Sequence, residues 1–416
     1  MVRRWLMFLG VLAYAVGSIA TAQGDALARP KYAIRAGKVL TMDDQNRVLD
    51  HVIIFVADGK IERIVPEKGA KIPDGYKVMD HSNHWVLPGF IDCHSHTATN
   101  QSGDLHDYVW LTNPGLRAGD LIQVDTFNNN RAIAGGVTTA LLIPGSGTNL
   151  SGFGGIARHG ARTIGEAVMR SPGSLKIAQA GNPERWYFGK GRSYMNYNLR
   201  QTLVKARRYW KRWSDFEAGV TKTRPAYDQR WEDFRLIFGK LIPASVHTQM
   251  FQVVSKSMTM LHDTFGMKLM IDHGTFDAYK AAALAIERKV YAIVGPRVWW
   301  MDEQDRTINS CAGKWWDAGL RKVGLNTDAG VLPQEDLRLQ GTLSVKYGWQ
   351  TYPALEGLTK TAAEILGVDD RIGIIAPGRD ADLVAWTGDP FDCRSGVERV
   401  FALGRVVYEA SGRRLY

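Results

Sequence analysis

One short stretch, P-G-F-I-D-C-H-S-H-T at residues 88–97, directs the interpretation of this chain. Its apolar first half indicates a strand that enters a core after a Pro-Gly turn. Because side chains on a strand alternate between its two faces, His94 and His96 lie on one face and Ser95 lies on the other. Two imidazoles on one face can bind one metal ion, although two polar residues in a loop beyond a strand would produce the same letters.

Through the middle of the chain, strand-like segments alternate with helix-like ones, a pattern typical of parallel βα units. Eight strands can be counted, and eight βα units predict a closed TIM (β/α)8 barrel whose active site lies at the C-terminal ends of the strands. The predicted strands are residues 90–94, 137–143, 155–159, 174–179, 244–248, 268–273, 290–295 and 322–328.

Short β-like segments flank this region on both sides. One of them carries an Asp58-Gly59 pair between two apolar runs, which predicts a tight hairpin turn. The C-terminal segments have the same texture as the N-terminal ones. We therefore expect a small composite β-sandwich domain built from residues 30–85 and 376–416, beside the (β/α)8 barrel, which covers residues 86–375.

The N-terminus has the features of a secretory signal. Arg3 and Arg4 precede a largely apolar stretch, and Ala20-Thr21-Ala22 supplies a small-x-small cleavage pattern. A retained membrane anchor is the alternative, since the apolar stretch nearly reaches spanning length. The small and polar residues at its end favour cleavage, so we expect residues 1–22 to be a signal peptide and the protein to be periplasmic or secreted.

The composition is that of an ordinary globular protein and not of a disordered or disulfide-rich one. Over 416 residues, 45% are hydrophobic and 23% are charged, which is ordinary for a globular protein. Three cysteines form no disulfide framework. The net charge is +10, and basic residues cluster between Arg200 and Arg235. Basic residues among aromatic ones can bind nucleic acid, but a solvated amphipathic helix is the favoured interpretation, and no nucleic-acid partner is expected.

The chemistry-bearing side chains gather at the ends of the predicted strands. Four of the ten histidines lie there, whereas the other six are mostly in turns, helices or the β-rich ends. A single histidine at a strand end is usually a core or loop residue, but this set favours a metal site. The set comprises His94, His96, Lys176, His247, His273 and Asp328, and the histidines left out of it are His51, His81, His84, His106, His159 and His262.

With these residues in place, the chain resembles the amidohydrolase superfamily, in particular its imidazolonepropionase-like and dipeptidase-like members. The resemblance runs from about Lys31 to the C-terminus. The most specific parts are the His-x-His entry, the strand-eight aspartate and the trailer. The motifs are P-G-F-I-D-C-H-S-H (88–96), G-G-V-T-T (135–139), S-L-K-I-A (174–178), V-H (246–247), I-D-H-G-T (271–275), N-T-D-A (326–329) and A-P-G-R-D-A-D-L-V (376–384).

The resemblance implies a metal centre with a defined ligand set. His94, His96 and Asp328 would hold the more buried ion, and His247 with His273 the more exposed one. Lys176 would be carboxylated to a carbamate that bridges two divalent ions, whereas an ion-paired, unmodified lysine would leave one. Zinc is expected, although these ligands also tolerate other divalent ions.

The resemblance also implies the reaction. A metal-activated hydroxide would attack a carbonyl, and Asp328 would transfer the proton to the leaving nitrogen. The expected substrate is an N-acyl amino acid, a dipeptide or a cyclic amide, with a homo-oligomer as a further partnership. Substrate contacts are assigned to Arg192, Arg297 and Trp299. Gly181 and the T-Q-M-F-Q stretch after His247 depart from the family pattern, so the alternative is a catalytically silent metal-binding barrel that acts as a ligand-binding protein.

The glycine-rich segment 144–155 matches neither a dinucleotide fingerprint nor a P-loop. It either brings backbone N–H groups near the site or is a flexible connection, and the sequence does not distinguish these two roles.

Overall fold

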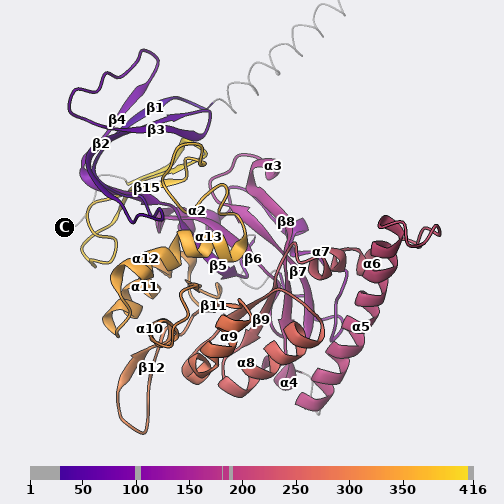
Figure 1. Cartoon of the computed structure of the whole chain (residues 1–416). Coiled ribbons are helices and arrows are strands. Elements are labelled where there is room, and N and C mark those ends of the chain that lie inside the picture. The colour runs from indigo at the N-terminus through magenta and orange to yellow at the C-terminus, as the bar shows by residue number, and fades with distance from the viewer. Residues whose placement is uncertain (1–28, 99–104, 180, 187–190, 411–416) are drawn as a thin grey trace, which may run out of the picture.

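The structure is a computed structural model that describes residues 29–98, 105–179, 181–186 and 191–410. The predicted signal peptide lies outside the described residues. In this part of the chain, no helix combines the length and the apolar character needed to cross a bilayer. The chain forms a barrel-like sheet with helices around it and a second, separate sheet (Figure 1).

The barrel contains every strand predicted for it. Its eight strands follow one another around the sheet in sequence order, and a parallel bridge between Ser95 and Ala329 brings the first and last strand ends together. The sheet is therefore a nearly closed TIM-like barrel. The strands are β5 (Phe90–Ser95), β6 (Val137–Leu142), β7 (Leu150–Arg158), β8 (Val168–Ala178), β9 (Ala244–Thr248), β10 (Leu269–His273), β11 (Tyr291–Val294) and β14 (Val323–Leu325).

One strand runs in the wrong direction for eight parallel βα units. β7 is antiparallel to both β6 and β8, whereas the other barrel pairings are parallel. A parallel crossover needs a dozen or more residues, and only residues 143–149 connect β6 to β7. The glycine-rich segment is thus the connection of a hairpin-like pair, and the prediction of a parallel strand at residues 155–159 was wrong in direction.

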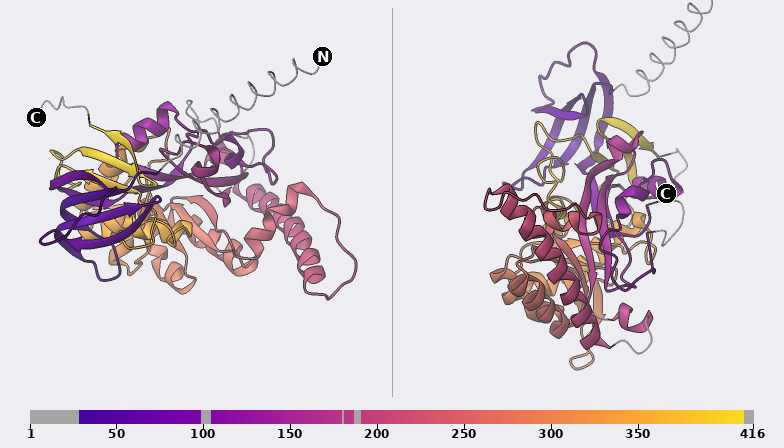
Figure 2. Two further views of the ribbon diagram at one scale, coloured as in Figure 1. Left: turned by 90° about the horizontal axis from the view of Figure 1, so that it is seen from above. Right: turned by 90° about the vertical axis from the view of Figure 1, so that its right-hand side faces the viewer.

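Helices cover the outside of the barrel. The longest, α5, lies on the side of the molecule away from the second sheet (Figure 2). It buries apolar and aromatic side chains such as Leu203, Tyr209 and Trp213 and exposes its basic ones, so the basic stretch is an amphipathic helix as expected. The helices are α2 (Phe127–Ala134), α3 (Ile164–Ala167), α4 (Asn182–Trp186), α5 (Arg192–Glu217), α6 (Gln229–Glu232), α7 (Phe234–Phe238), α8 (Phe251–Ser257), α9 (Ala282–Glu287), α10 (Cys311–Asp317), α11 (Leu337–Lys346), α12 (Thr351–Leu358) and α13 (Lys360–Leu366).

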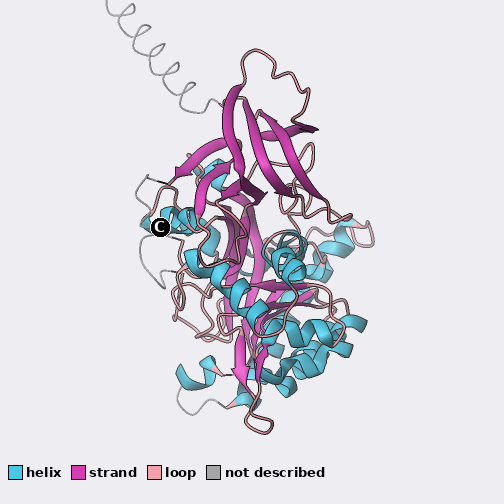
Figure 3. Ribbon diagram, turned by 90° about the vertical axis from the view of Figure 1, so that its left-hand side faces the viewer, coloured by secondary structure: helices cyan, strands magenta, loops and turns pink. Residues whose placement is uncertain are grey.

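Both ends of the chain share the second sheet, at one end of the molecule (Figure 3). Its order is β17-β16-β15-β4-β1-β2-β3. The described strands at the two ends form this single sheet, so two ends do combine, but a sandwich of two packed sheets is not confirmed. The strands are β1 (Tyr32–Leu40), β2 (Val48–Ala57), β3 (Lys60–Pro66), β4 (Lys77–Pro88), β15 (Leu383–Trp386), β16 (Val397–Ala402) and β17 (Arg405–Glu409), and a separate hairpin joins β12 (Trp299–Met301) to β13 (Ile308–Ser310).

The structure requires glycine at a hairpin turn of this sheet and at its connection to the barrel. Asp58 and Gly59 both have positive φ, 51° and 79°, as a two-residue hairpin turn requires, so that prediction is confirmed. Gly89 separates β4 from β5 and so connects the second sheet to the barrel. A Cβ atom there would lie 2.0 Å from the Thr138 hydroxyl oxygen, so only glycine fits at this crossing.

A buried ion cluster joins the barrel to the C-terminal trailer. Arg158, at the end of β7, donates from Nη2 to Asp380 Oδ2 at 2.5 Å and from Nε to Asp382 Oδ2 at 2.7 Å. All three side chains are buried. The two aspartates of the R-D-A-D-L-V motif are therefore structural, because they neutralise an arginine that has left water.

Replacing this arginine should strongly destabilise the fold. Arg158→Met leaves Asp382 buried without its cation and Asp380 with weaker pairing, so we expect a loss of about 3–5 kcal/mol in the free energy of unfolding. Urea denaturation measures this loss. Arg394→Met is the matched control, since its ion pair with Asp392 is exposed and should contribute little to stability. Equal stability of the two variants would contradict a structural role for the cluster.

Candidate metal centre

The structure brings the six predicted site residues together at the C-terminal end of the barrel. They come from the first, fourth, fifth, sixth and eighth barrel strands or the residues directly after them. The rings of His94 and His273 lie 5.1 Å apart between centroids, and those of His247 and His273 lie 4.3 Å apart. Residues up to 234 positions apart in the sequence therefore form one cluster.

Three ligand atoms converge at its centre. His94 Nε2 and His96 Nε2 are 2.9 Å apart, and Asp328 Oδ1 lies 3.3 Å from the first and 3.0 Å from the second. These atoms are close enough to share one ion. Two imidazole nitrogens this close repel one another if both carry lone pairs, and a cation between them removes that repulsion.

Backbone carbonyls set which nitrogen faces the cluster. His96 Nδ1 lies 2.6 Å from the Ile143 carbonyl oxygen, and His273 Nδ1 lies 2.7 Å from that of Gly295. A carbonyl oxygen only accepts, so each Nδ1 carries the proton and each Nε2 carries a lone pair. This arrangement orients a histidine for metal binding, and the residues present therefore fit a divalent ion.

Asp272 belongs to the centre although strand alternation placed it elsewhere. Its Oδ2 is hydrogen-bonded to His94 Nδ1 and accepts from Ser245 Oγ at 2.8 Å. Burial alone would raise the pKa of Asp272, but the charges of His94 and Lys176 hold it well below its usual range. Sequence reasoning missed it because alternation opposes it to His273. In the structure His273 has φ of 74°, which breaks the alternation.

Lys176 is fully buried beneath His94. Its Nζ donates to Asp272 Oδ2 at 3.0 Å and lies 3.3 Å from His94 Nε2. This is the contact expected of an ion-paired strand lysine. It also places the amine at the metal cluster, where the resemblance puts a bridging carbamate, so the carboxylated form stays a prediction.

His247 has a buried nitrogen that the protein does not satisfy. Within the described residues, Nδ1 has no hydrogen-bond partner. Burial and the neighbouring His273 hold the pKa of His247 well below its usual range, which keeps the ring neutral. Leaving a buried nitrogen unpaired costs about 1–3 kcal/mol, and a metal ligand role would remove that cost.

The three predicted substrate contacts lie apart from this cluster. Arg192 pairs with Glu184, Arg297 lies over the ring of Phe276, and Trp299 packs against Tyr347. In the parts of the chain that are described, no contact joins them to the six site residues. Their assignment to substrate stays a prediction.

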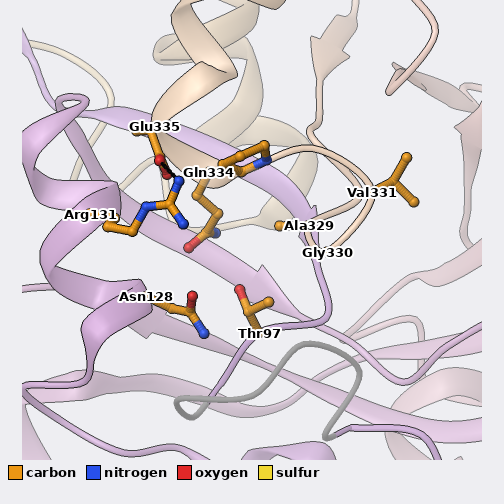
Figure 4. Close-up of a pocket in the computed structure, with 9 residues that line it drawn as sticks. Thr97, Asn128, Arg131, Ala329, Gly330, Val331, Gln334 and Glu335 are labelled. Atoms are coloured by element: carbon orange, nitrogen blue, oxygen red, sulfur yellow. Dashed lines mark ion pairs between the residues drawn. The ribbon is translucent and has the colours of Figure 1, made fainter.

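A cavity of about 270 Å³ opens beside the centre instead. Its walls come from residues directly after the ligand strands, including Thr97 and Ala329, and from the start of helix α2 (Figure 4). An ion pair between Arg131 and Glu335 lies across one side of the cavity. Thr97 and Ala329 directly follow His96 and Asp328 in the sequence, so the cavity adjoins the centre.

Comparisons with known proteins agree with this geometry. A profile of the Amidohydrolase family matches residues 305–407. The crystal structure of an amidohydrolase from Thermotoga maritima MSB8 superposes with a TM-score of 0.81 at 28% identity, over 91% of this chain and 100% of that one. The predicted resemblance to the amidohydrolase superfamily is thereby confirmed in both sequence and fold. The relatives of this chain indicate a hydrolase that acts on C–N bonds.

More distant relatives of this chain carry other names. It is 24% identical to the imidazolonepropionase of Hahella chejuensis, over 86% of this chain and 91% of that protein. It is 22% identical to the amidohydrolase tasK of Hapsidospora irregularis, of which it spans only 39%. A Xaa-Pro dipeptidase with bound methionine has a TM-score of 0.58 at 18% identity over 91% of this chain and all of that one, which shows the shared fold alone.

Removing the negative charge of Asp272 behind His94 should weaken metal binding by this protein. Asp272→Asn keeps an oxygen near His94 Nδ1 but loses the negative charge, and losing such a partner typically lowers metal affinity 10–100-fold. Competition with a chelator of known affinity measures the change, on protein that circular dichroism shows to be folded. Asp263→Asn, at an exposed ion pair, is the control and should bind metal normally. Unchanged affinity in folded Asp272→Asn would exclude this role.

Proposed function

We propose that the protein is an exported, metal-dependent amidohydrolase that hydrolyses the C–N bond of an N-acyl amino acid, a dipeptide or a cyclic amide. The observation that carries the proposal is the convergence of His94 Nε2, His96 Nε2 and Asp328 Oδ1 within 3.3 Å of one another. The name imidazolonepropionase among the sequence relatives supports the cyclic amide. A catalytically silent binding protein is less favoured, since these relatives carry enzyme names.

The charges of the centre suit a divalent cation. Asp272 and Asp328 contribute two negative charges and Lys176 one positive charge, so the buried cluster has a deficit of positive charge when its histidines are neutral. Zinc is proposed because nitrogen and oxygen ligands of this kind suit it. A divalent ion bound there would acidify a water molecule and polarise a substrate carbonyl.

The chemical state of Lys176 would determine whether the centre holds one metal ion or two. Only a neutral amine reacts with carbon dioxide, so carboxylation requires Lys176 to release its proton and its bond to Asp272. The product adds a negative charge next to that carboxylate, and cations must offset the repulsion. Carboxylation and binding of a second ion are therefore coupled: the carbamate form holds two ions per chain, and the ion-paired form holds one.

Asp328 is the proposed proton carrier. Burial would raise its pKa, but its close contacts with His94 and His96 hold the pKa well below its usual range, so the carboxylate is ionised at neutral pH. Its side chain is partly exposed, unlike that of His94. It can therefore accept the proton of the attacking water and deliver it to the leaving nitrogen.

Export is proposed from the N-terminal residues alone. The basic start, apolar stretch and Ala20-Thr21-Ala22 pattern support a cleaved signal. We expect the mature protein to begin near Gln23. N-terminal sequencing of protein purified from its natural host tests this, and an intact Met1 would refute it.

A hydrolysis screen with metal quantified on the same sample tests the function. The panel consists of N-acyl amino acids, dipeptides and cyclic amides. We expect turnover of at least one class, loss of turnover on chelation and recovery with zinc. Two ions per chain would support the carbamate form of Lys176, and one ion the paired form. No turnover of any class by metal-loaded protein would refute the proposed hydrolase.

Asp328→Asn tests the proton carrier. Asparagine keeps an oxygen ligand but accepts no proton at neutral pH, so turnover per bound metal should fall by roughly two to four orders of magnitude. Metal content should fall much less, because the histidines remain. Asp305→Asn, an exposed aspartate distant from the centre, is the control. Near-normal turnover by folded, metal-loaded Asp328→Asn would show that the carboxylate is not the proton carrier.

A further inference from the structure

A histidine and a tyrosine outside the predicted ligand set lie against the metal centre. The ring of His106 is 4.8 Å from that of His96 between centroids, at an interplanar angle of 66°. His106 Nδ1 lies 2.8 Å from the Tyr108 hydroxyl oxygen. Sequence analysis grouped His106 with the histidines away from the site, because it follows no strand directly. The structure therefore adds an imidazole to the mouth of the barrel.

The glycine-rich loop at residues 144–149 packs directly against these two rings. A Cβ atom on Gly145 would lie 1.9 Å from His106 Cε1, and one on Gly147 would lie 2.0 Å from Tyr108 Cε1. Neither glycine has a positive φ, so the missing side chain rather than the backbone conformation explains why glycine is needed. The rings occupy the space that two side chains would otherwise fill.

Hydrogen bonds from Ser151, at the start of β7, hold this loop in place. Ser151 Oγ donates to the Gly145 carbonyl oxygen at 2.6 Å and lies 2.7 Å from Thr148 Oγ1. The loop begins directly after Ile143, whose carbonyl oxygen orients His96. One buried loop therefore orients a proposed metal ligand and positions His106 next to it. Residues 144–149 are buried and form one wall of the site.

The contact with Tyr108 indicates which ring nitrogen of His106 carries the proton. A phenol hydroxyl donates readily to an imidazole nitrogen, which makes Nδ1 the acceptor and leaves the proton on Nε2. His106 belongs to neither group of potential metal ligands found among the described residues, both of which contain His94. It is thus a hydrogen-bond donor beside the centre.

We propose that His106 is a substrate-contacting residue whose Nε2–H donates a hydrogen bond to the acyl oxygen of the bond that is hydrolysed, and that Tyr108 is its positioning residue. This inference rests on the proposed function. The acyl oxygen gains negative charge as the tetrahedral intermediate forms, so a fixed donor stabilises the transition state more than the substrate. The substrate class is one with a carbonyl oxygen that becomes an oxyanion, and inorganic phosphate imitates its tetrahedral, anionic form.

The test uses full-length, metal-loaded protein and five variants. His106→Ala removes the donor, His106→Gln retains an N–H donor, and Gly145→Ala displaces the ring without touching it chemically. Gly165→Ala is the matched glycine control, since a Cβ there meets nothing within 4 Å. His262→Ala is the histidine control, because it contacts Asp263 on a helix outside the barrel.

Two readouts are combined with metal content and thermal stability. On the best substrate of the screen, His106→Ala and Gly145→Ala should lower kcat about 100-fold with a smaller change in KM, and His106→Gln should recover part of the loss. Calorimetric titration with inorganic phosphate should show about tenfold weaker binding in the same two variants. Metal per chain should stay at the wild-type value, and both controls should behave as wild type.

The phosphate titration separates this inference from the proposed function. If wild-type protein hydrolyses nothing, the proposed function fails, and weaker phosphate binding by His106→Ala and Gly145→Ala still supports the donor. Wild-type kcat and phosphate affinity in His106→Ala would overturn the inference. A loss of metal in that variant would also overturn it, because His106 would then be a ligand, as would a metal-loaded wild type that binds no phosphate.

Discussion

The first and last strands of the barrel are joined through one buried carboxylate, and the metal centre depends on that junction. Asp92 accepts hydrogen bonds from the backbone N–H groups of His94 at 3.2 Å and Thr327 at 3.1 Å, and from the Thr327 hydroxyl. Burial raises its pKa to about 6. These bonds tie together the two chain segments that carry His94 and Asp328. The Ser95–Ala329 bridge and the hydrogen bond from Asp328 N–H to the His94 carbonyl oxygen, at 3.2 Å, join the same two segments.

Within that frame, three histidines of the centre are each oriented by a hydrogen-bond partner behind the ring. Backbone carbonyls hold His96 and His273, and Asp272 holds His94, so the free nitrogens point inward. Lys176 offsets part of the negative charge that this arrangement buries. One ammonium and two carboxylates give the buried cluster a net negative charge when its histidines are neutral. A bound divalent cation would compensate this charge, whereas an ordinary protein core would leave it uncompensated.

The short β6–β7 connection links fold and site in the same way. Because it is too short for a crossover, β7 turns back antiparallel, and its buried glycines allow neighbouring segments to approach closely. At its start the connection orients His96 and seats His106. At the other end of β7, Arg158 binds the aspartates of the C-terminal trailer and thereby joins the barrel to the second sheet. Strand β7 therefore connects the mouth of the barrel, where the candidate metal centre lies, to the ion cluster that attaches the second sheet.

The sequence by itself determined what local periodicity controls: the eight barrel strands, the Asp58-Gly59 turn, the shared sheet of the two chain ends, and the placement of His94 and His96 on one face. These follow because strand alternation and turn chemistry act over a few residues. Only the tertiary structure decided the direction of β7, the inclusion of Asp272 and the position of His106. The reason is physical: a positive φ at His273 breaks alternation, and the absence of side chains on Gly145 and Gly147 matters only once other segments pack against them.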